Sequence, residues 1–202
     1  MKRVFWLTLL AFALPMAAFA NNSVDFTNSG GILSGSSAGL TLSGSELIAI
    51  NGLNGLGLIT GNLGKVGFTT GALLSGSLGE GGTFAGGGSF FIDGNGTGGI
   101  PNGAIFTGSF TGPVTWTMVT LANGTHDYTL TGTISGTWYT GVTSYGTTVQ
   151  LTINTGKNYF KGSTKISSGD TNIVVAPEPG TLTLLGTGLL GLAGVLWRKL
   201  KA

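Results

Sequence analysis

The sequence predicts an all-β protein whose body is an antiparallel β-sandwich or a barrel-like sheet. In several segments apolar residues recur at every second position, and Gly, Asn and Ser divide these segments as turns divide strands. No amphipathic helix pattern occurs between the two termini. The body is rich in Val, Ile, Leu, Phe and Thr and poor in charge, which distinguishes it from a disordered chain despite its many glycines. The pattern leaves sandwich and barrel open.

The clearest element is a hairpin over residues 113–138. Apolar side chains alternate with threonine on its first strand, and Asn123-Gly124 supplies the residues that a type I′ turn requires. On the return strand one face is apolar and the other carries Thr and Ser. We therefore expect one face of this hairpin in the core and the other in solvent.

Alternation of the same kind recurs along the body. Gly132 and Gly136 interrupt the apolar face of the return strand, where we expect a bend or a large neighbour such as Trp116 over the backbone. Repeated Gly-Ser/Thr-hydrophobic units leave a glycine-rich β-solenoid as an alternative, although their spacing is irregular and a solenoid needs a fixed period. Further strands are expected over residues 40–50, 63–68, 72–78, 83–92, 104–110, 148–153 and 172–175.

Residues 1–20 predict a secretory signal peptide. Two basic residues precede an apolar run that is shorter than the roughly 20 residues of a membrane span. Ala18 and Ala20 provide small side chains at the two positions that a signal peptidase reads, so cleavage leaves Asn21 as the first mature residue. An uncleaved N-terminal anchor is the alternative.

Residues 181–197 form an uncharged apolar run that predicts a single transmembrane helix. At about 1.5 Å per residue this helix is short but long enough for a slightly thinned bilayer. Trp197 lies where interfacial aromatics occur, and Arg198, Lys199 and Lys201 follow as a basic stop that stays on the cytoplasmic side. Both ends of the chain therefore predict a body outside the cytoplasm.

A proline-containing segment joins the body to this apolar run. Pro177 and Pro179 disfavour helix at and before their own positions, and Glu178 keeps the segment out of the hydrocarbon. The tripeptide, the glycine-rich apolar run and the basic end together resemble the PEP-CTERM sorting signal. The resemblance implies export by a Gram-negative bacterium and recognition by an exosortase, a membrane cysteine transpeptidase whose substrate includes Pro177, Glu178 and Pro179. A stiff linker is the alternative interpretation of these residues.

The composition of the body excludes several classes of function. Four lysines oppose six acidic residues, a net charge of −2, and no basic cluster suited to nucleic acid occurs. The chain has no cysteine, which excludes disulfides, thiol catalysis and thiolate metal sites. The predicted parts are a signal peptide at 1–20, a β domain at 21–174 and a sorting tail at 175–202.

Few residues in the body suggest catalysis. His126 is the only histidine and is expected to be exposed beside the hairpin turn. A Gly-x-Ser-x-Gly motif occurs at residues 35–39, but without the strand-to-helix context of a nucleophile elbow. Acidic residues are scattered singly, whereas glycosidases need two carboxyl groups roughly 5 to 10 Å apart. We therefore predict that the protein is not an enzyme.

One loop has the beginnings of a calcium site. Asp93, Asn95 and Thr97 place oxygen atoms at alternate positions of a glycine-rich segment, as calcium loops do. The third ligand is only a threonine, and no closing glutamate follows at the EF-hand spacing. A plain glycine turn is the alternative, and no other cofactor is predicted.

The sequence favours a non-enzymatic protein of the cell surface or extracellular matrix. It would be held briefly in the inner membrane with its body in the periplasm and then cut by the exosortase, with exopolysaccharide or further copies of itself as partners. A carbohydrate-binding module is the first alternative, with Tyr139 and Tyr145 as exposed aromatics, whereas Trp116 and Trp138 belong to the inward face. A surface hydrolase is the second alternative.

Overall fold

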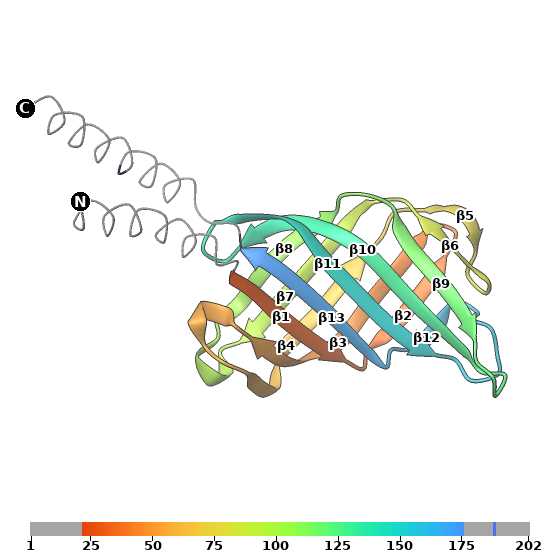
Figure 1. The fold of residues 1–202 in the computed structure, drawn as a ribbon, viewed down its shortest axis with the longest axis horizontal. Helices are drawn as coiled ribbons and strands as arrows, with labels where there is room; N and C mark the ends of the chain where they lie inside the picture. Colours follow the sequence, from red (N-terminus) through yellow and green to blue (C-terminus); the bar gives the residue numbers. More distant parts are fainter. Residues whose placement is uncertain (1–21, 176–187, 189–202) are drawn as a thin grey trace, which may run out of the picture. The chain divides into compact units, whose positions relative to one another are not determined.

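The computed structural model describes residues 22–175 and residue 188. Residues 22–175 fold into a single sheet of thirteen strands (Figure 1). Two short 3-10 turns, η1 (Leu53–Gly55) and η2 (Thr97–Gly99), interrupt the strands. The strands are β1 (Asn22–Ser29), β2 (Ile32–Ser36), β3 (Gly39–Asn51), β4 (Ile59–Thr69), β5 (Leu73–Ser77), β6 (Gly81–Phe84), β7 (Gly87–Asn95), β8 (Asn102–Phe110), β9 (Val114–Thr120), β10 (His126–Trp138), β11 (Thr143–Asn154), β12 (Ser163–Lys165) and β13 (Ser168–Val175).

Eight of these strands close into an antiparallel barrel. Their order around the barrel is β1, β3, β4, β7, β8, β10, β11 and β13, and β13 returns to lie beside β1. Because the ring is closed, its strands have no free edges. The body is therefore a barrel rather than an open sandwich. The solenoid alternative is wrong for the described residues, because their strands pair as antiparallel neighbours instead of stacking in repeats.

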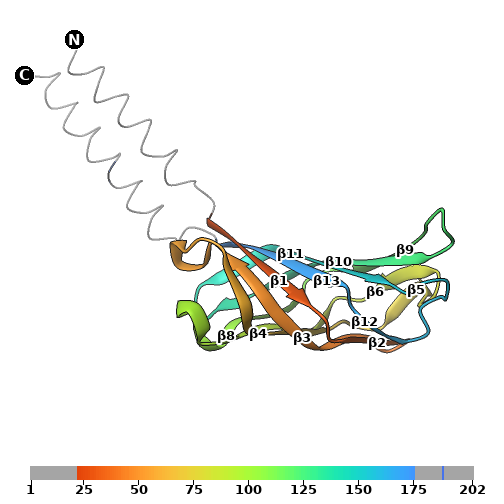
Figure 2. The ribbon, with the colours of Figure 1, turned by 90° about the horizontal axis from the view of Figure 1, so that it is seen from below.

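Two long strands extend the sheet beyond the ring. One edge of β3 pairs first with β2 and then with β1. In the same way, one edge of β10 pairs first with β9 and then with β8. β2 also pairs with β12, while β9 also pairs with β6, which pairs with β5. Figure 2 shows β2 and β9 on opposite sides of the molecule, at the end away from the start of β1. The barrel thus continues into two facing flaps.

The predicted period of two is confirmed in the strands that carry the core. In β10 the inward positions include Tyr128, Leu130 and Ile134, which are fully buried, and threonines occupy the positions between them. Aromatic rings fill much of the interior, and Phe68 packs edge-on against Phe110 with centroids 5.7 Å apart. Burial of this apolar surface, worth about 25 cal/mol per Å², is the main force that holds the barrel closed.

The hairpin between β9 and β10 is confirmed, but its turn differs from the predicted one. A type I′ turn needs positive φ at both central residues. Here only Gly124 has positive φ, at 78°, and the Leu121 amide donates to the Thr125 carbonyl across a three-residue loop. The Asn123 side chain accepts hydrogen bonds from the amide and the hydroxyl of Thr125 instead of entering the left-handed region. The predicted turn type was therefore wrong.

Large neighbours do lie over the two glycines of β10, but they are phenylalanines. A Cβ at Gly132 would lie 2.7 Å from the Phe110 ring, and one at Gly136 would lie 2.7 Å from the Phe106 ring. Trp116, the neighbour suggested by the sequence, lies farther along the strand, opposite Leu130. Gly132 therefore leaves room for a ring of β8 inside the barrel. Gly136 also lets the β8 backbone approach, because a Cβ there would collide with the Thr107 carbonyl oxygen.

The first and last strands place both chain connections at one end of the barrel. The Ser29 hydroxyl bonds the Ser167 carbonyl, and Asn172 bonds Asp25, so β1 and β13 run antiparallel (Figure 1). The start of β1 and the end of β13 therefore lie together, at what we call the exit end. The exit end carries loops 52–58, 96–101 and 139–142. The opposite, distal end carries loops 78–80, 121–125 and 155–162.

The predicted signal peptide, with Ala18 and Ala20, and nearly all of the predicted tail lie outside the described residues. The tail includes the Pro-Glu-Pro motif, the apolar run 181–197 and the basic stop. Within the described part of the chain we find no helix with the length and apolar character of a membrane span.

Candidate functional site

A hollow of about 330 Å³ opens at the distal end, beside loop 155–162. The loop connects β11 to β12, and hydrogen bonds fix its path. The Thr155 amide donates to the His126 carbonyl at 3.0 Å, and the Thr155 hydroxyl donates to the Asn158 carbonyl at 2.6 Å. Residues that line the hollow include Thr155, Asn158, Tyr159, Lys161, Ser163 and Thr164.

Core side chains anchor the same loop from below. Phe160 is buried, and its amide donates to the Tyr128 hydroxyl at 3.0 Å. That hydroxyl in turn donates to the Gly79 carbonyl at 2.6 Å. One buried phenol therefore ties β10, loop 78–80 and loop 155–162 together, so the hollow has a rigid floor.

Tyr159 presents an aromatic ring at the rim of this hollow. Half of its surface is exposed, and its ring stacks on His126 with centroids 4.4 Å apart and planes 18° apart. His126 is only 6% exposed, and its Nδ1 lies 3.0 Å from the Thr120 hydroxyl. The expectation of an exposed histidine was wrong, because Tyr159 covers a ring that starts the inward face of β10. The stacked imidazole in turn limits the positions that the Tyr159 ring can take.

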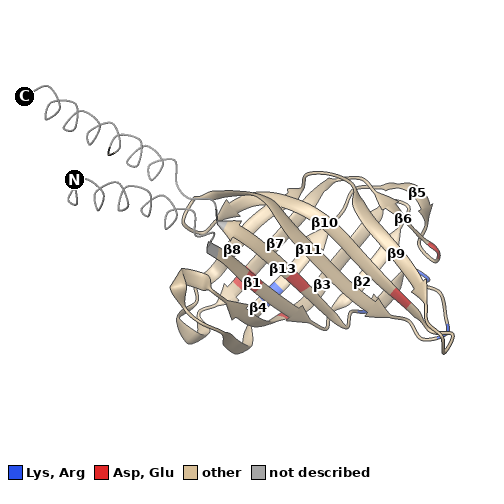
Figure 3. Cartoon of the chain, viewed as in Figure 1, with Lys and Arg blue, Asp and Glu red and all other residues tan. Residues whose placement is uncertain are grey.

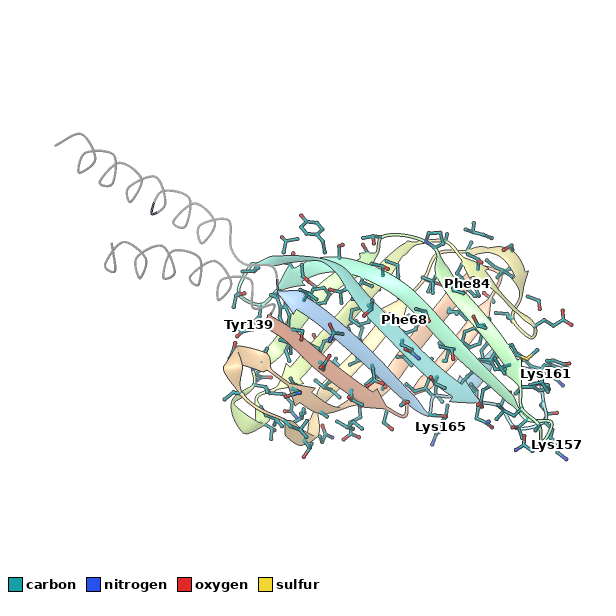
Figure 4. The ribbon with its side chains drawn as sticks, in the orientation of Figure 1. Phe68, Phe84, Tyr139, Lys157, Lys161 and Lys165 are labelled. Carbon is teal, nitrogen blue, oxygen red and sulfur yellow. The ribbon has the colours of Figure 1, made fainter. Side chains whose placement is uncertain are left out.

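Two lysines lie at the same end. Figure 4 shows Lys157 and Lys161 at the distal end and Lys165 nearer the middle of the body, all three away from Tyr139. All three come from the segment that connects β11 to β13, and Lys161 lines the hollow. A flexible ammonium beside a fixed aromatic ring and several hydroxyl or amide groups suits a polar ligand with a flat apolar face, such as a sugar.

A second, larger hollow of about 580 Å³ lies on the outer wall, over β1, β13 and β11. It brings together Asp25 and Asp170, two carboxylates that the sequence left unpaired. Asp25 accepts a hydrogen bond from Asn172, and Thr148 and Gln150 complete the polar lining. Both carboxylates are exposed on an open wall, so they offer hydrogen-bond acceptors to solvent.

Of the residues suggested for calcium, Asp93 and Asn95 lie at the end of β7 and Thr97 begins the η2 turn. Lys65 lies 3.5 Å from the Asp93 carboxylate, across the β4–β7 pair. The Asn95 side-chain oxygen accepts from the Thr97 amide, and its nitrogen donates to the Asn62 carbonyl. These bonds are those of an Asx turn, the alternative left open by the sequence. Across residues 22–175, no three His, Cys, Asp or Glu side chains group as metal ligands.

The two tryptophans predicted to face inward are buried, at 1% exposure for Trp116 and 5% for Trp138. The exposed tyrosines do not form the aligned row that many sugar-binding faces use. Tyr139 and Tyr145 lie at the exit end, whereas Tyr159 lies at the distal end. The sequence missed Tyr159 as a site residue, because its stacking partner is 33 positions away and the only local signal was an aromatic pair after a turn.

Comparison with known proteins bears on the tail alone. The family model of the PEP-CTERM protein-sorting motif matches residues 175–199, which confirms the motif inferred from the sequence. Such a motif indicates export and membrane-associated sorting in bacteria by an exosortase-type enzyme. No curated protein and no solved structure matches the chain. The tail is therefore similar to a known sorting signal, while the barrel must be interpreted from its own geometry.

Proposed function

We propose that this chain is an exported, non-enzymatic protein of the cell surface or extracellular matrix. Its signal peptide directs export, and its tail then holds the barrel at the outer side of the inner membrane of a Gram-negative bacterium. An exosortase-type transpeptidase cuts near Pro177, Glu178 and Pro179 and delivers the barrel outward. In this scheme the three residues are the substrate of the processing enzyme.

The observation that carries this proposal is where the matched motif begins. It starts at residue 175, and β13 ends at Val175, so the last strand is complete before the tripeptide. The hydrogen bonds that close the barrel join β13 to β11 and β1, upstream of the motif. Removal of the tail therefore costs the barrel none of its strands, as delivery of a folded product requires.

A Glu178→Ala substitution tests the proposal. We expect most of the variant to stay in the inner-membrane fraction, whereas the unchanged protein reaches the surface fraction, because the enzyme no longer recognises its substrate. Fractionation with an antibody to the barrel measures this. Glu80→Ala, in an exposed distal turn, is the matched control and should behave like the unchanged protein. Equal surface delivery of both variants would contradict the sorting role.

A second candidate function, carbohydrate binding, is favoured by the distal hollow. Tyr159 is both half-exposed and fixed by His126, so stacking a sugar ring on its free face costs little conformational freedom. Lys161 at the same hollow favours an acidic exopolysaccharide over a neutral one. The surface protein would then bind the matrix through the end opposite its tail.

Replacing Tyr159 by alanine tests this second function. We expect affinity for acidic exopolysaccharide to fall about tenfold, equivalent to about 1.4 kcal/mol, which is the size of a good aromatic contact. Tyr145→Ala is the matched control, because Tyr145 is more exposed but lies at the exit end. Co-sedimentation of the purified protein with polysaccharide measures the effect. A similar loss in both variants would remove the hollow as the binding site.

A further inference from the structure

The three loops at the exit end carry no charged residue, whereas two of the three distal loops carry Glu80, Lys157 and Lys161. Loops 52–58, 96–101 and 139–142 contain only Gly, Leu, Asn, Thr, Ile, Pro, Tyr and Val. Figure 3 shows the η1 and η2 loops entirely in tan, without acidic or basic residues. Uncharged loops can leave bulk water without desolvating a charge. The nearest charges, Asp25 and the Lys65–Asp93 ion pair, lie on the strands beside these loops.

Large apolar side chains are exposed at the exit end. Leu56 and Leu58 are 42% and 67% exposed in the loop after β3, and Tyr139 and Tyr145 are 42% and 73% exposed around the turn into β11. The Tyr139 hydroxyl donates to the Asn54 side chain at 2.6 Å, which joins the two loops into one surface. Tyrosine is enriched at membrane interfaces, and leucine forms part of the apolar face of helices that lie in that layer.

The chain itself leads from this surface toward the apolar tail. The Ser144 hydroxyl donates to the Val174 carbonyl, so the last residues of β13 lie directly beside the strand that carries Tyr145. Only five residues, 176–180, separate Val175 from the apolar run. Fully extended, the six Cα–Cα steps from Val175 to residue 181 span at most ~22 Å. Any membrane that holds residues 181–197 therefore lies within that distance of the end of β13.

We propose that the exit end rests on the lipid surface while the tail is in the membrane, with Leu56, Leu58, Tyr139 and Tyr145 in the interfacial layer. This inference builds on the proposed membrane-held precursor and adds an orientation to it. The barrel stands with its distal end outward, and the bond to be cut lies in a narrow gap between barrel and bilayer. Four side chains without a basic cluster bind lipid weakly, so the contact ends when the tail is cut.

Exposed leucine alone does not define the surface. Leu74 and Leu121 are exposed in the distal half, 61% and 39% respectively. Their end also carries Glu80, Lys157 and Lys161, and neither chain connection leaves from it. The distal leucines are therefore internal controls for a test of lipid contact.

The test uses the full chain with its tail, purified and reconstituted into phosphatidylethanolamine–phosphatidylglycerol vesicles. The chain has no cysteine, so one introduced thiol takes an environment-sensitive fluorophore at a single place. Gly57→Cys is suited to this, because a Cβ there meets no atom within 4 Å and the residue lies between the two exit leucines. Ala122→Cys, next to Leu121 in the exposed distal hairpin, is the matched control.

We expect the label at position 57 to lose about half of its fluorescence when the vesicles contain a lipid with a quencher near the headgroup, since interfacial contacts reach ~5–10 Å into that layer. The label at position 122 should be unaffected. Adding Leu56→Ser and Leu58→Ser to the Gly57→Cys chain should weaken the quenching. Equal quenching at both positions, or none at 57, would overturn the proposed orientation.

Two further measurements distinguish lipid contact at position 57 from other causes of the same signal. Flotation of the vesicles reports whether the tail holds the chain in lipid, and a chain that does not float overturns both the membrane-held precursor and the docked end. If position 57 becomes buried only as protein concentration rises, or only when the processing enzyme is present, the occupant is a second copy or that enzyme. Either result would replace the lipid surface as the partner.

Discussion

The two ends of the barrel differ in charge and in how their cores satisfy polar groups. At the distal end Trp116 stacks on Tyr128, and its indole N–H donates to the Leu78 carbonyl at 2.9 Å. At the exit end Trp138 packs against Phe26 and Phe106, but its indole N–H has no hydrogen-bond partner among the described residues. The distal core is thus locked by hydrogen bonds to loops, whereas the exit core relies on ring packing.

This difference matches the proposed division of roles. At the distal end hydrogen bonds hold loop 155–162 against the core, and a rigid loop is needed to keep Tyr159 fixed over a ligand. The exit end needs only uncharged loops beside the chain connections. The comparison predicts that equivalent substitutions at the two ends have unequal effects on stability.

The largest effect is expected from Trp116→Ala. This substitution removes a fully buried ring, its stacking on Tyr128 and its contact with Phe160. We expect the free energy of unfolding to fall by about 3–5 kcal/mol. Urea unfolding followed by far-ultraviolet circular dichroism measures it. A loss below about 1 kcal/mol would mean that the distal core is not packed as described.

Tyr128→Phe should have an intermediate effect. The ring remains, but the Phe160 amide loses its acceptor and the Gly79 carbonyl loses its donor. We expect a loss of about 1–3 kcal/mol, the cost of leaving a buried polar group unpaired. Tyr159→Phe is the control, because no hydrogen bond of the Tyr159 hydroxyl occurs among the described contacts. Equal losses in the two variants would argue against the tie between the loops.

The smallest effect is expected from Trp138→Phe. Its indole N–H has no bond to lose, so only the smaller ring counts, and we expect a loss of about 1 kcal/mol or less. Trp116→Phe should lower the free energy of unfolding further, by about 1–3 kcal/mol, because it leaves the Leu78 carbonyl without its donor. The same urea unfolding compares them. If Trp138→Phe proves the more damaging, the contrast between the two cores is wrong.

Local patterns in the sequence predicted the β class, most central strands and the tail motif. The alternation around Trp116 and Leu130 depends on neighbouring residues only, and the Pro-Glu-Pro tail is a linear signal. Closure of the barrel was not predictable, because it depends on β1 meeting β13 from the far end of the domain. The predicted strand 83–92 proved to be β6 and β7, which diverge toward different partners at Ala85.

The candidate site was harder to predict than the fold. His126 was expected to be exposed, because its burial depends on Tyr159, a loop residue distant in sequence. β1 and β2 were also missed, because polar residues and glycine interrupt their apolar pattern, and β12 was missed because its three residues include no apolar one. Burial of such strands is decided by their partners in the sheet rather than by their own composition.

The most direct test of the account is the intact mass of the protein recovered from the cell surface. If the tail is a sorting signal that is removed after export, the mass corresponds to a chain that starts at Asn21 and ends between residues 175 and 180. A surface protein whose mass includes the tail through Ala202 would contradict processing and leave residues 181–197 as a permanent membrane anchor.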